Sequence, residues 1–300
     1  MVPEGEQAKS RAEWTRLSDQ LLDLGFGRDA AIIALGGGVV GDLAGFVAAT
    51  YLRGVPVVQV PTTLVAMVDA AIGGKTGVDT GHGKNLIGAF HQPAAVVADP
   101  RCLLTLTDRD YRSGLAEAVK HAIIADHEYF GWLDDNAEGV AGRDLKLLAP
   151  LVETSVRIKA EVVTRDEREA GPRAHLNLGH TIGHGIEQAS GYRLRHGEAV
   201  ALGLVAETSL AANLGLAPRD LPPRVKTLLD RLGLPVALTE PLRPDVVLNV
   251  MGYDKKASRG TIRFSLPSAV GAMAGTPAAW TVPVTDQGEI TAAMKTIGIG

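Results

Sequence analysis

The sequence predicts an α/β N-terminal domain followed by a mostly α-helical C-terminal domain, and three observations support this. Short apolar runs, glycine-rich turns and helical patterns alternate through the first third of the 300 residues. Beyond about residue 106 apolar residues recur at helical spacing, and strand-like runs return only at 261–266 and near 280–284. The length also favours about two domains. We therefore place the domains at residues 1–105 and 106–300.

The composition excludes several classes of protein. A hydrophobic fraction of 46% and a charged fraction of 21% are typical of a globular chain with a sizeable core. The net charge of −4 gives no indication of a nucleic-acid or membrane partner. Cys102 is the single cysteine, so no intramolecular disulfide forms. With no apolar signal segment and no run of roughly 18 apolar residues, the sequence predicts a cytoplasmic protein.

The first third contains the elements of a parallel sheet. Residues 10–24 have the spacing of an amphipathic helix, and the apolar run 30–35 predicts a buried strand. That strand ends in G-G-G-V-V-G-D, and a helix is expected at 43–50. A strand, a glycine turn and a helix together offer backbone N–H groups to a phosphate. A tight turn without any ligand explains the same residues equally well.

Two further strands are expected at 56–60 and 94–99, with a helix between them that reaches Ala71. Lys75 and Lys84 lie in glycine-rich segments that we expect to be loops, although the spacing is not that of a P-loop. Two lysines in such loops favour an anionic ligand. Solvated loop lysines are the alternative.

The C-terminal domain is expected to be built from helices. Helical periodicity covers residues 111–125, 145–167, 176–189, 196–214 and 224–232. Pro150 is expected to start or kink the second of these helices, because proline lacks a backbone N–H.

Residues 173–198 hold four of the eight histidines, His175, His180, His184 and His196. On a helix, His180 and His184 would stand on one face, one turn apart, which suits a shared metal ion. Two polar residues on a solvated helix face are the alternative. The glycines at 179, 183 and 185 each cost a helix about 1 kcal/mol, which indicates that something approaches the backbone closely.

Ten motifs occur in one order across nearly the whole chain. They are E-G-E-Q-A-K (4–9), G-G-G-V-V-G-D (36–42), Y-L-R-G-V-P (51–56), Q-V-P-T-T-L (59–64), V-D-A-A-I-G-G-K-T (68–76), G-K-N-L-I-G-A-F (83–90), S-G-L-A-E-A-V-K (113–120), D-E-R-E-A-G-P-R (166–173), L-N-L-G-H-T-I-G-H (176–184) and R-H-G-E-A-V-A (195–201). In these motifs the chain resembles the 3-dehydroquinate synthase family of sugar-phosphate cyclases.

The resemblance implies a Rossmann-like domain that binds NAD, here residues 1–105, and a mostly helical domain for metal and substrate, here 106–300. It implies a phosphorus–oxygen lyase of the shikimate pathway, which supplies aromatic amino acid biosynthesis. Such an enzyme cyclises 3-deoxy-D-arabino-heptulosonate 7-phosphate to 3-dehydroquinate with loss of phosphate. NAD acts catalytically, the metal is Zn²⁺ or Co²⁺, and the enzyme is expected to be a homodimer.

The resemblance also assigns site residues. Its metal ligands replace the pair of His180 and His184 that spacing alone suggests. The implied metal ligands are Glu117, His180 and His196, and His184 faces the substrate. The residues implied around the substrate ring, its carboxylate or the metal-bound oxygens are Asp69, Lys75, Lys120 and Asn177. Those implied around the phosphate and C5 are Asn85, Lys159, Arg173 and His184, with Arg53 reaching in from a partner subunit and Lys255 or Lys256 as a further candidate. The residues implied for NAD are Glu4, Lys9, Gly37, Gly38, Val39, Val40, Gly41, Asp42, Thr62, Thr63, Lys75, Lys84 and Thr105.

Two alternatives remain open at this point. A sibling cyclase would keep the NAD and metal sites and act on another sugar phosphate, such as sedoheptulose 7-phosphate. A catalytically silent scaffold would keep only the fold. A turnover assay combined with metal analysis separates these possibilities.

The chain departs from the family pattern at its beginning. Family members usually carry several dozen residues, including the first strands, before the motif that begins here at Glu4. We therefore expect exposed apolar surface on strand 30–35 or a neighbour, an unpaired sheet edge, normal metal binding and weak NAD binding. Calorimetric titration of NAD into this chain and into an N-terminally extended one tests this expectation.

Overall fold

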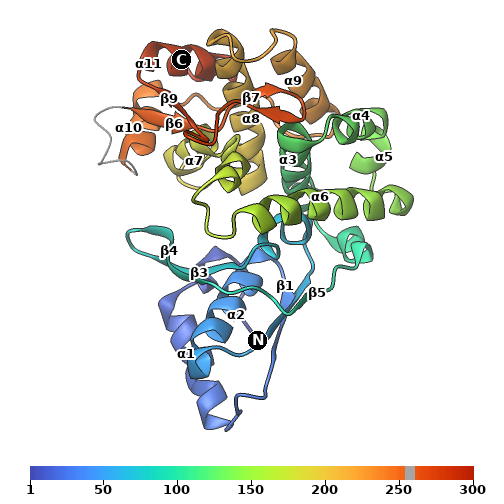
Figure 1. The fold of residues 1–300 in the computed structure, drawn as a ribbon, viewed down its shortest axis with the longest axis vertical. Coiled ribbons are helices and arrows are strands. Elements are labelled where there is room, and N and C mark those ends of the chain that lie inside the picture. The colour runs from blue at the N-terminus through green and yellow to red at the C-terminus, as the bar shows by residue number, and fades with distance from the viewer. Residues whose placement is uncertain (254–260) are drawn as a thin grey trace. The chain divides into compact units, whose positions relative to one another are not determined.

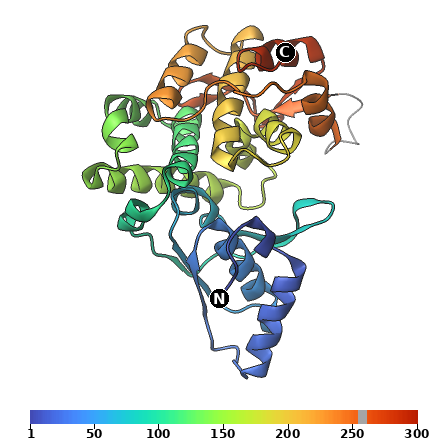
Figure 2. The same cartoon turned by 180° about the vertical axis from the view of Figure 1, so that it is seen from behind.

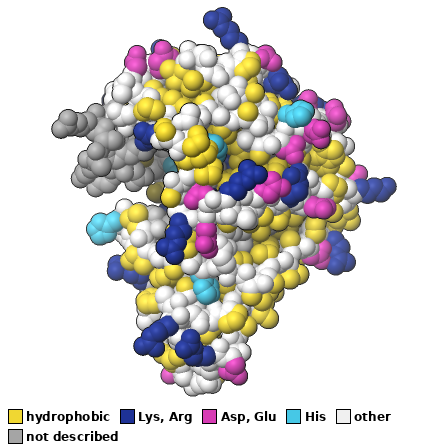
Figure 3. All heavy atoms as spheres, in the orientation of Figure 1, with side chains coloured by type: hydrophobic (Ala, Val, Ile, Leu, Met, Phe, Trp, Pro, Cys, Tyr) yellow, Lys and Arg dark blue, Asp and Glu magenta, His cyan; other side chains and the backbone are white. Residues whose placement is uncertain are grey.

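The computed structural model describes residues 1–253 and 261–300, and Lys255 and Lys256 lie outside them. The chain divides into two compact units, Met1–Leu106 and Thr107–Gly300. The first unit is α/β and the second is mostly helical, in agreement with the predicted fold class (Figure 1). Over the face drawn in Figure 3, positive and negative side chains are interspersed.

The first unit is built on a parallel sheet. Its strands are β1 (Ile32–Gly36), β2 (Val57–Pro61) and β5 (Ala95–Val96), in the order β1-β2-β5. Helix α2 (Gly38–Thr50) connects β1 to β2, which is the crossover that parallel strands require. The third strand, expected over 94–99, is only two residues long.

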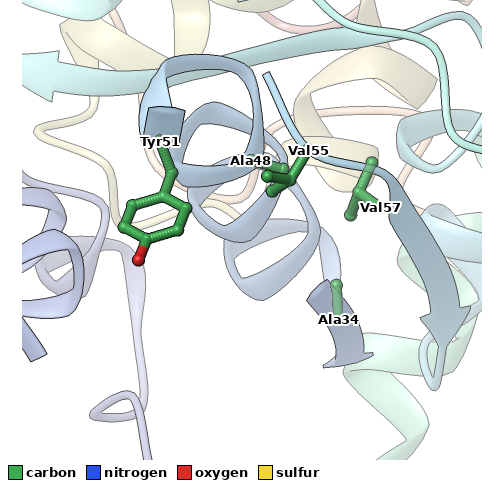
Figure 4. Packing of buried hydrophobic residues seen from close by; sticks show 5 residues of the cluster. All are labelled: Ala34, Ala48, Tyr51, Val55 and Val57. Atoms are coloured by element: carbon green, nitrogen blue, oxygen red, sulfur yellow. The ribbon is translucent and has the colours of Figure 1, made fainter. Parts of the chain in front are cut away.

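Apolar side chains between α2 and the sheet form the core of this unit. Figure 4 shows five of them, Ala34, Ala48, Tyr51, Val55 and Val57. The Tyr51 hydroxyl lies 2.8 Å from the carbonyl oxygen of Phe26 and 3.1 Å from that of Leu21. Tyr51 thereby fastens the end of α1 (Arg11–Asp23) to the helix that carries the glycine turn.

Strand β1 is the end strand in this sheet order, and half of its side chains face outward. Ile33 is 70% exposed and Leu35 is 66% exposed. The expectation of exposed apolar surface on this strand is therefore confirmed. The prediction of a buried strand from the apolar run alone is wrong, because Ala34 is the one buried residue of β1.

The two glycine-rich segments with Lys75 and Lys84 are not loops, so that prediction is wrong. They form an antiparallel hairpin of β3 (Lys75–Thr80) and β4 (Gly83–Phe90), whose turn projects from the unit in Figures 1 and 2. The glycines serve the pairing of the strands. A Cβ on Gly88 would lie 2.1 Å from the Thr76 carbonyl oxygen, closer than any side chain permits.

Short helical turns complete this unit. They are η1 (Glu6–Ala8), η2 (Tyr51–Arg53), the π-helical turn η3 (Ala66–Ala70) and η4 (Pro100–Thr105).

The second unit is organised around helix α8 (His196–Asn213). Every residue from 199 to 211 is buried, as expected for a mostly apolar helix at the centre of a unit. Its neighbours are α3 (Asp108–Ala125), α7 (His180–Ala189), α9 (Leu221–Arg231) and α11 (Gln287–Lys295).

The remaining elements surround this core. The helices are α4 (His127–Asp135), α5 (Ala137–Ala141), α6 (Leu145–Arg165), η5 (Pro172–Asn177) and α10 (Pro244–Tyr253). The strands are β6 (Ile262–Phe264) with β9 (Val282–Val284), and β7 (Pro267–Ala269) with β8 (Ala272–Met273). Within the described ranges no helix is long and apolar enough to cross a lipid bilayer.

Two helix predictions need correction. The helix expected over 176–189 is interrupted by Gly179, whose φ of 78° is left-handed, so α7 begins only at His180. Pro150 does not start its helix, because α6 begins five residues earlier, where the Asp144 side chain accepts the N–H of Lys146, and a kink at Pro150 stays a prediction.

Candidate functional site

Three helices of the second unit bring one carboxylate and two imidazoles together. Glu117 lies on α3, and His180 and His196 are the first residues of α7 and α8. Glu117 Oε1 is 3.2 Å from His196 Nε2 and 3.5 Å from His180 Nε2. Donor atoms around a tetrahedral zinc ion with bonds of ~2.0 Å are about 3.3 Å apart. The spacing therefore suits one divalent ion and leaves one coordination position open.

Glycines allow these three helices to approach so closely. A Cβ on Gly197 would lie 1.9 Å from the Ser113 carbonyl oxygen on α3, and one on Gly203 would lie 1.9 Å from the Gly179 carbonyl oxygen. The Gly197 N–H donates to Ser113 Oγ at 2.9 Å. At Gly183 a Cβ would be 3.0 Å from the Ala199 carbonyl oxygen. The close approach expected at Gly179 and Gly183 is therefore the packing of α7 against α8, whereas Gly185 lies against side chains of α10.

Each imidazole is oriented so that Nε2 faces Glu117. His180 Nδ1 lies 3.0 Å from the Leu178 carbonyl oxygen and donates to it, and this bond turns Nε2 toward Glu117. On the other ring, His196 Nδ1 lies 3.6 Å from the carboxylate of Glu187. Carboxylate or carbonyl partners of this kind are usual behind metal-binding histidines. We did not predict Glu187 from the sequence, although it follows His180 by seven residues and so shares its helix face.

Buried charges set the electrostatics of the cluster. The ammonium of Lys120 pairs with the second oxygen of Glu117, and both residues are at most 1% exposed. Burial alone would raise the pKa of Glu117, but Lys120 and then His180 hold it well below its usual range. Burial would lower the pKa of His196, whereas the carboxylates of Glu117 and Glu187 raise it to about 9. A metal ion would therefore displace a proton from His196 at neutral pH.

His184 is exposed and lies beside the cluster. Its ring centroid is 5.2 Å from that of His180 and 5.8 Å from that of His196. His184, Glu187 and His196 also place donor atoms within 4.8 Å of one another. Two sets of three potential ligands therefore share His196, and only the set with Glu117 and His180 combines a fully buried carboxylate with facing Nε2 atoms.

A turn after α6 holds other residues expected at the site. The Asp166 carboxylate accepts the backbone N–H groups of Ala170, Gly171 and Arg173 at 3.0, 2.7 and 3.1 Å. Arg173 is 1% exposed and donates to the carbonyl oxygen of Glu167.

Two more of the expected residues lie in this unit. The Asn177 side-chain amide donates to Glu169 at 2.7 Å, and Lys159 is a buried cation of α6. We did not predict roles for Asp166 and Glu169, although both lie in the D-E-R-E-A-G-P-R motif.

In the first unit, the residues expected at the NAD phosphates gather where the parallel strands end. Gly37 precedes α2, and residues 38–42 form its first turn. Thr62 and Thr63 follow β2 directly, and Thr62 N–H donates to the Gly36 carbonyl oxygen at 2.9 Å. The Thr63 methyl lies 3.1 Å from the position of a Cβ on Gly37. A helix N-terminus beside the carboxyl ends of parallel strands is a common site for phosphate groups.

A second group of expected residues joins the N-terminal segment to α2 and the hairpin. Lys9 is buried and its ammonium pairs with the carboxylate of Asp42. Burial raises the pKa of Glu6, which the sequence analysis did not single out, while Lys9 and Lys84 oppose that rise. The Lys9 carbonyl oxygen accepts the N–H of Asp79 at 2.8 Å.

The other residues expected at the site in the first unit are spread over several elements. Asp69 is in η3, Lys75 begins β3, and Asn85 is in β4 with a φ of 57°. Glu4 is exposed near the N-terminus, and Arg53 is exposed at the end of η2. The Thr105 hydroxyl donates to the Cys102 carbonyl oxygen at 3.1 Å.

Comparison with solved structures supports the same fold. A 2-deoxy-scyllo-inosose synthase complexed with carbaglucose-6-phosphate, NAD⁺ and Co²⁺ aligns with a TM-score of 0.90 at 29% identity, over 98% of this chain and 81% of the other. The 2-epi-5-epi-valiolone synthase of Streptomyces hygroscopicus subsp. jinggangensis, with NAD⁺ and Zn²⁺ bound, aligns with a TM-score of 0.88 at 31% identity, over 99% and 81%.

Sequence comparison identifies the family. The chain is 49% identical over 277 residues to the 3-dehydroquinate synthase of Symbiobacterium thermophilum, covering 92% of this chain and 77% of that protein. It is 48% identical to the one of a Synechococcus strain, covering 90% and 74%. The family models for the N-terminal and C-terminal parts of 3-dehydroquinate synthase match residues 1–113 and 114–257. The chain therefore belongs to the 3-dehydroquinate synthase family.

Proposed function

We propose that this chain converts 3-deoxy-D-arabino-heptulosonate 7-phosphate to 3-dehydroquinate and phosphate, as a lyase that depends on NAD and a divalent metal ion. The observation that carries the proposal is the cluster of Glu117, His180 and His196, whose donor spacing suits one ion in a chain of this family. The curated relatives at 46–49% identity are named 3-dehydroquinate synthase, whereas the solved sibling cyclases are only 29–31% identical. These identities favour the dehydroquinate reaction over a sibling reaction.

When bound, NAD supplies a hydride acceptor that later returns the hydride, and the metal ion supplies a Lewis acid for the substrate oxygens. The chain's own residues bind, orient and move protons. Glu117, His180 and His196 would hold the ion, while Lys120 keeps the Glu117 carboxylate ionised and fixed. His184, exposed beside the ion ligands, can hold or release a proton near neutral pH.

The substrate carries a carboxylate and a phosphate, and buried cations suit both groups. Arg173 and Lys159 are cations with less than 10% of their surface exposed, and the turn around Asp166 fixes the backbone of Arg173. We assign the NAD phosphates to the first turn of α2, from Gly37 to Asp42, with Thr62 and Thr63 beside it.

Zinc as the metal, a homodimer in which Arg53 reaches the partner's site, and a cytoplasmic location are further parts of the proposal. The metal and the homodimer rest on the resemblance, and the location rests on the single cysteine and the lack of an apolar signal segment. Metal analysis of the purified protein and its mass in solution test the first two.

A turnover assay tests the function. Phosphate release from 3-deoxy-D-arabino-heptulosonate 7-phosphate should stop when a chelator removes the metal and return with zinc or cobalt. Sedoheptulose 7-phosphate serves as the comparison substrate and should release no phosphate. Full activity of the metal-free protein, or turnover of only the comparison substrate, would contradict the proposal.

A further inference from the structure

Helix α8 carries a buried carboxylate that the proposed reaction does not use. Glu207 has no exposed surface, and its two oxygens accept the backbone N–H groups of Gly179 at 2.7 Å and Ile182 at 2.8 Å. Gly179 immediately precedes α7, and Ile182 is the third residue of that helix. Glu207 therefore binds the beginning of α7 from a neighbouring helix.

This contact satisfies donors that a helix cannot satisfy by itself. The first N–H groups of an α-helix have no partner within the helix, and a side chain just before the helix usually caps them. Here the capping position is Gly179, which has no side chain. A carboxylate from a distant part of the sequence takes its place, and negative charge is favourable at a helix N-terminus.

The two bonds lie on either side of a proposed metal ligand. His180 is between Gly179 and Ile182, so Glu207 fixes the backbone from which the His180 ring extends. The ring itself is fixed separately, by the bond of Nδ1 to the Leu178 carbonyl oxygen. Backbone and ring are thus both held without any contribution from a metal ion.

Glu207 also belongs to the helix that carries the other imidazole. It follows His196 by eleven residues, which is about three helical turns, so the two residues share a face of α8. Between them Gly203 brings the α8 backbone against the Gly179 carbonyl. A shift of α7 along α8 would move His180 relative to His196, and the Glu207 bonds oppose that shift.

We infer that Glu207 is a positioning residue of the metal centre, which holds the first turn of α7 against α8 and so fixes His180 relative to His196. The inference rests on the metal ligands assigned under the proposed function. It predicts a loss of metal affinity on substitution, in addition to any loss of stability.

The test is the Co²⁺ affinity of the metal-free protein, measured by competition with a chelator, together with the visible spectrum of bound Co²⁺. Glu207→Gln places an NH₂ group, which cannot accept, against one of the two N–H donors. We expect it to weaken Co²⁺ binding about 10–100-fold, the usual effect of losing a group behind a metal ligand, and to change the spectrum. Glu207→Asp keeps the charge on a shorter side chain and should fall between Glu207→Gln and the original protein.

Thr208→Val is the matched control, because it removes a buried polar group from the same helix. Among the residues that the structure describes, the Thr208 hydroxyl donates only to carbonyl oxygens of α8 itself, at Leu204 and Val205. This variant should lose stability but keep its Co²⁺ affinity and spectrum. The inference is overturned if Glu207→Gln and Glu207→Asp bind Co²⁺ within about twofold of the original protein, or if Thr208→Val loses as much affinity. If the original protein itself binds no Co²⁺, the metal site of the proposed function fails instead.

Discussion

Replacing Gly203 with alanine adds one methyl group where α8 lies against the start of α7. The new Cβ would lie 1.9 Å from the Gly179 carbonyl oxygen, 2.8 Å from its carbon and 3.0 Å from the nitrogen of Gly183. All three atoms are backbone, so no side-chain rotation relieves the overlap. The two helices must separate by about 1 Å or more, and overpacking of this kind costs about 1–3 kcal/mol or more of the free energy of unfolding.

The same displacement separates the proposed ligands. His180 on α7 and His196 on α8 both face Glu117, at 3.5 and 3.2 Å. A metal site requires distances from the ion to its ligand atoms that lie within ~0.2 Å of the usual values. We therefore expect Gly203→Ala to lower the Co²⁺ affinity of the metal-free protein by about tenfold or more, equivalent to about 1.4 kcal/mol.

Gly131→Ala is the control, because it makes the same chemical change in another helix. Gly131 is exposed in α4, and no atom lies within 4 Å of the added Cβ. Alanine there should raise the free energy of unfolding by up to about 1 kcal/mol and leave Co²⁺ binding unchanged. Urea unfolding and Co²⁺ titration of both variants give the comparison. A Gly203→Ala protein as stable as the original, with unchanged Co²⁺ affinity, would refute the reasoning.

Three further predictions concern single side chains. His184→Ala should keep its metal and lose most of its turnover, as metal analysis and the phosphate-release assay would show; loss of metal here, with retention in His196→Ala, would reverse the ligand assignment. Lys120→Met should lower the free energy of unfolding of the metal-free protein by up to about 3–5 kcal/mol, because the buried Glu117 carboxylate loses its cation. The loss should be smaller when zinc is bound. Equal losses in urea unfolding with and without zinc would contradict this. Burial would raise the pKa of Asp166, but backbone N–H donors lower it below its usual range, so its stabilising contribution is complete above about pH 4 and is lost as the pH falls through the lower folded value. The Tm difference between the original protein and Asp166→Asn should accordingly shrink in acid, and a constant difference would exclude this role of the charge.

The helices and the parallel sheet could be predicted because periodicity records which residues are buried. Helix α8 and strands β1 and β2 lie where the apolar pattern places them. The hairpin of β3 and β4 was not predicted, because a glycine-rich sequence is typical of loops. In the structure Gly88 lies against the Thr76 carbonyl of the partner strand. The start of α7 at His180 was not predicted either. The apolar pattern continues across Gly179 and does not indicate the left-handed φ of this residue.

The site was harder to predict because its contacts join distant parts of the sequence. Spacing within one helix favoured His180 with His184, whereas Glu117 and His196 come from two other helices. We assigned Glu207 no role from the sequence, although a carboxylate in a mostly apolar helical stretch is uncommon. Its partners precede it by 25 and 28 residues, which no local pattern connects.

The contacts behind each proposed ligand lead to a last prediction, that the metal site exists before the metal binds. The Leu178 carbonyl and Glu207 hold His180, Lys120 holds Glu117, and the contact of Gly197 with Ser113 places the start of α8 against α3. None of these contacts requires an ion, unlike small zinc domains in which metal binding and folding are one event. The metal-free chain should therefore show the same far-ultraviolet circular dichroism as the zinc-loaded chain, and zinc at a hundred times its Kd should add about 2.7 kcal/mol of stability by mass action. A metal-free chain that loses much of its helical signal would show that the ion assembles the three helices instead of entering a site they have already formed.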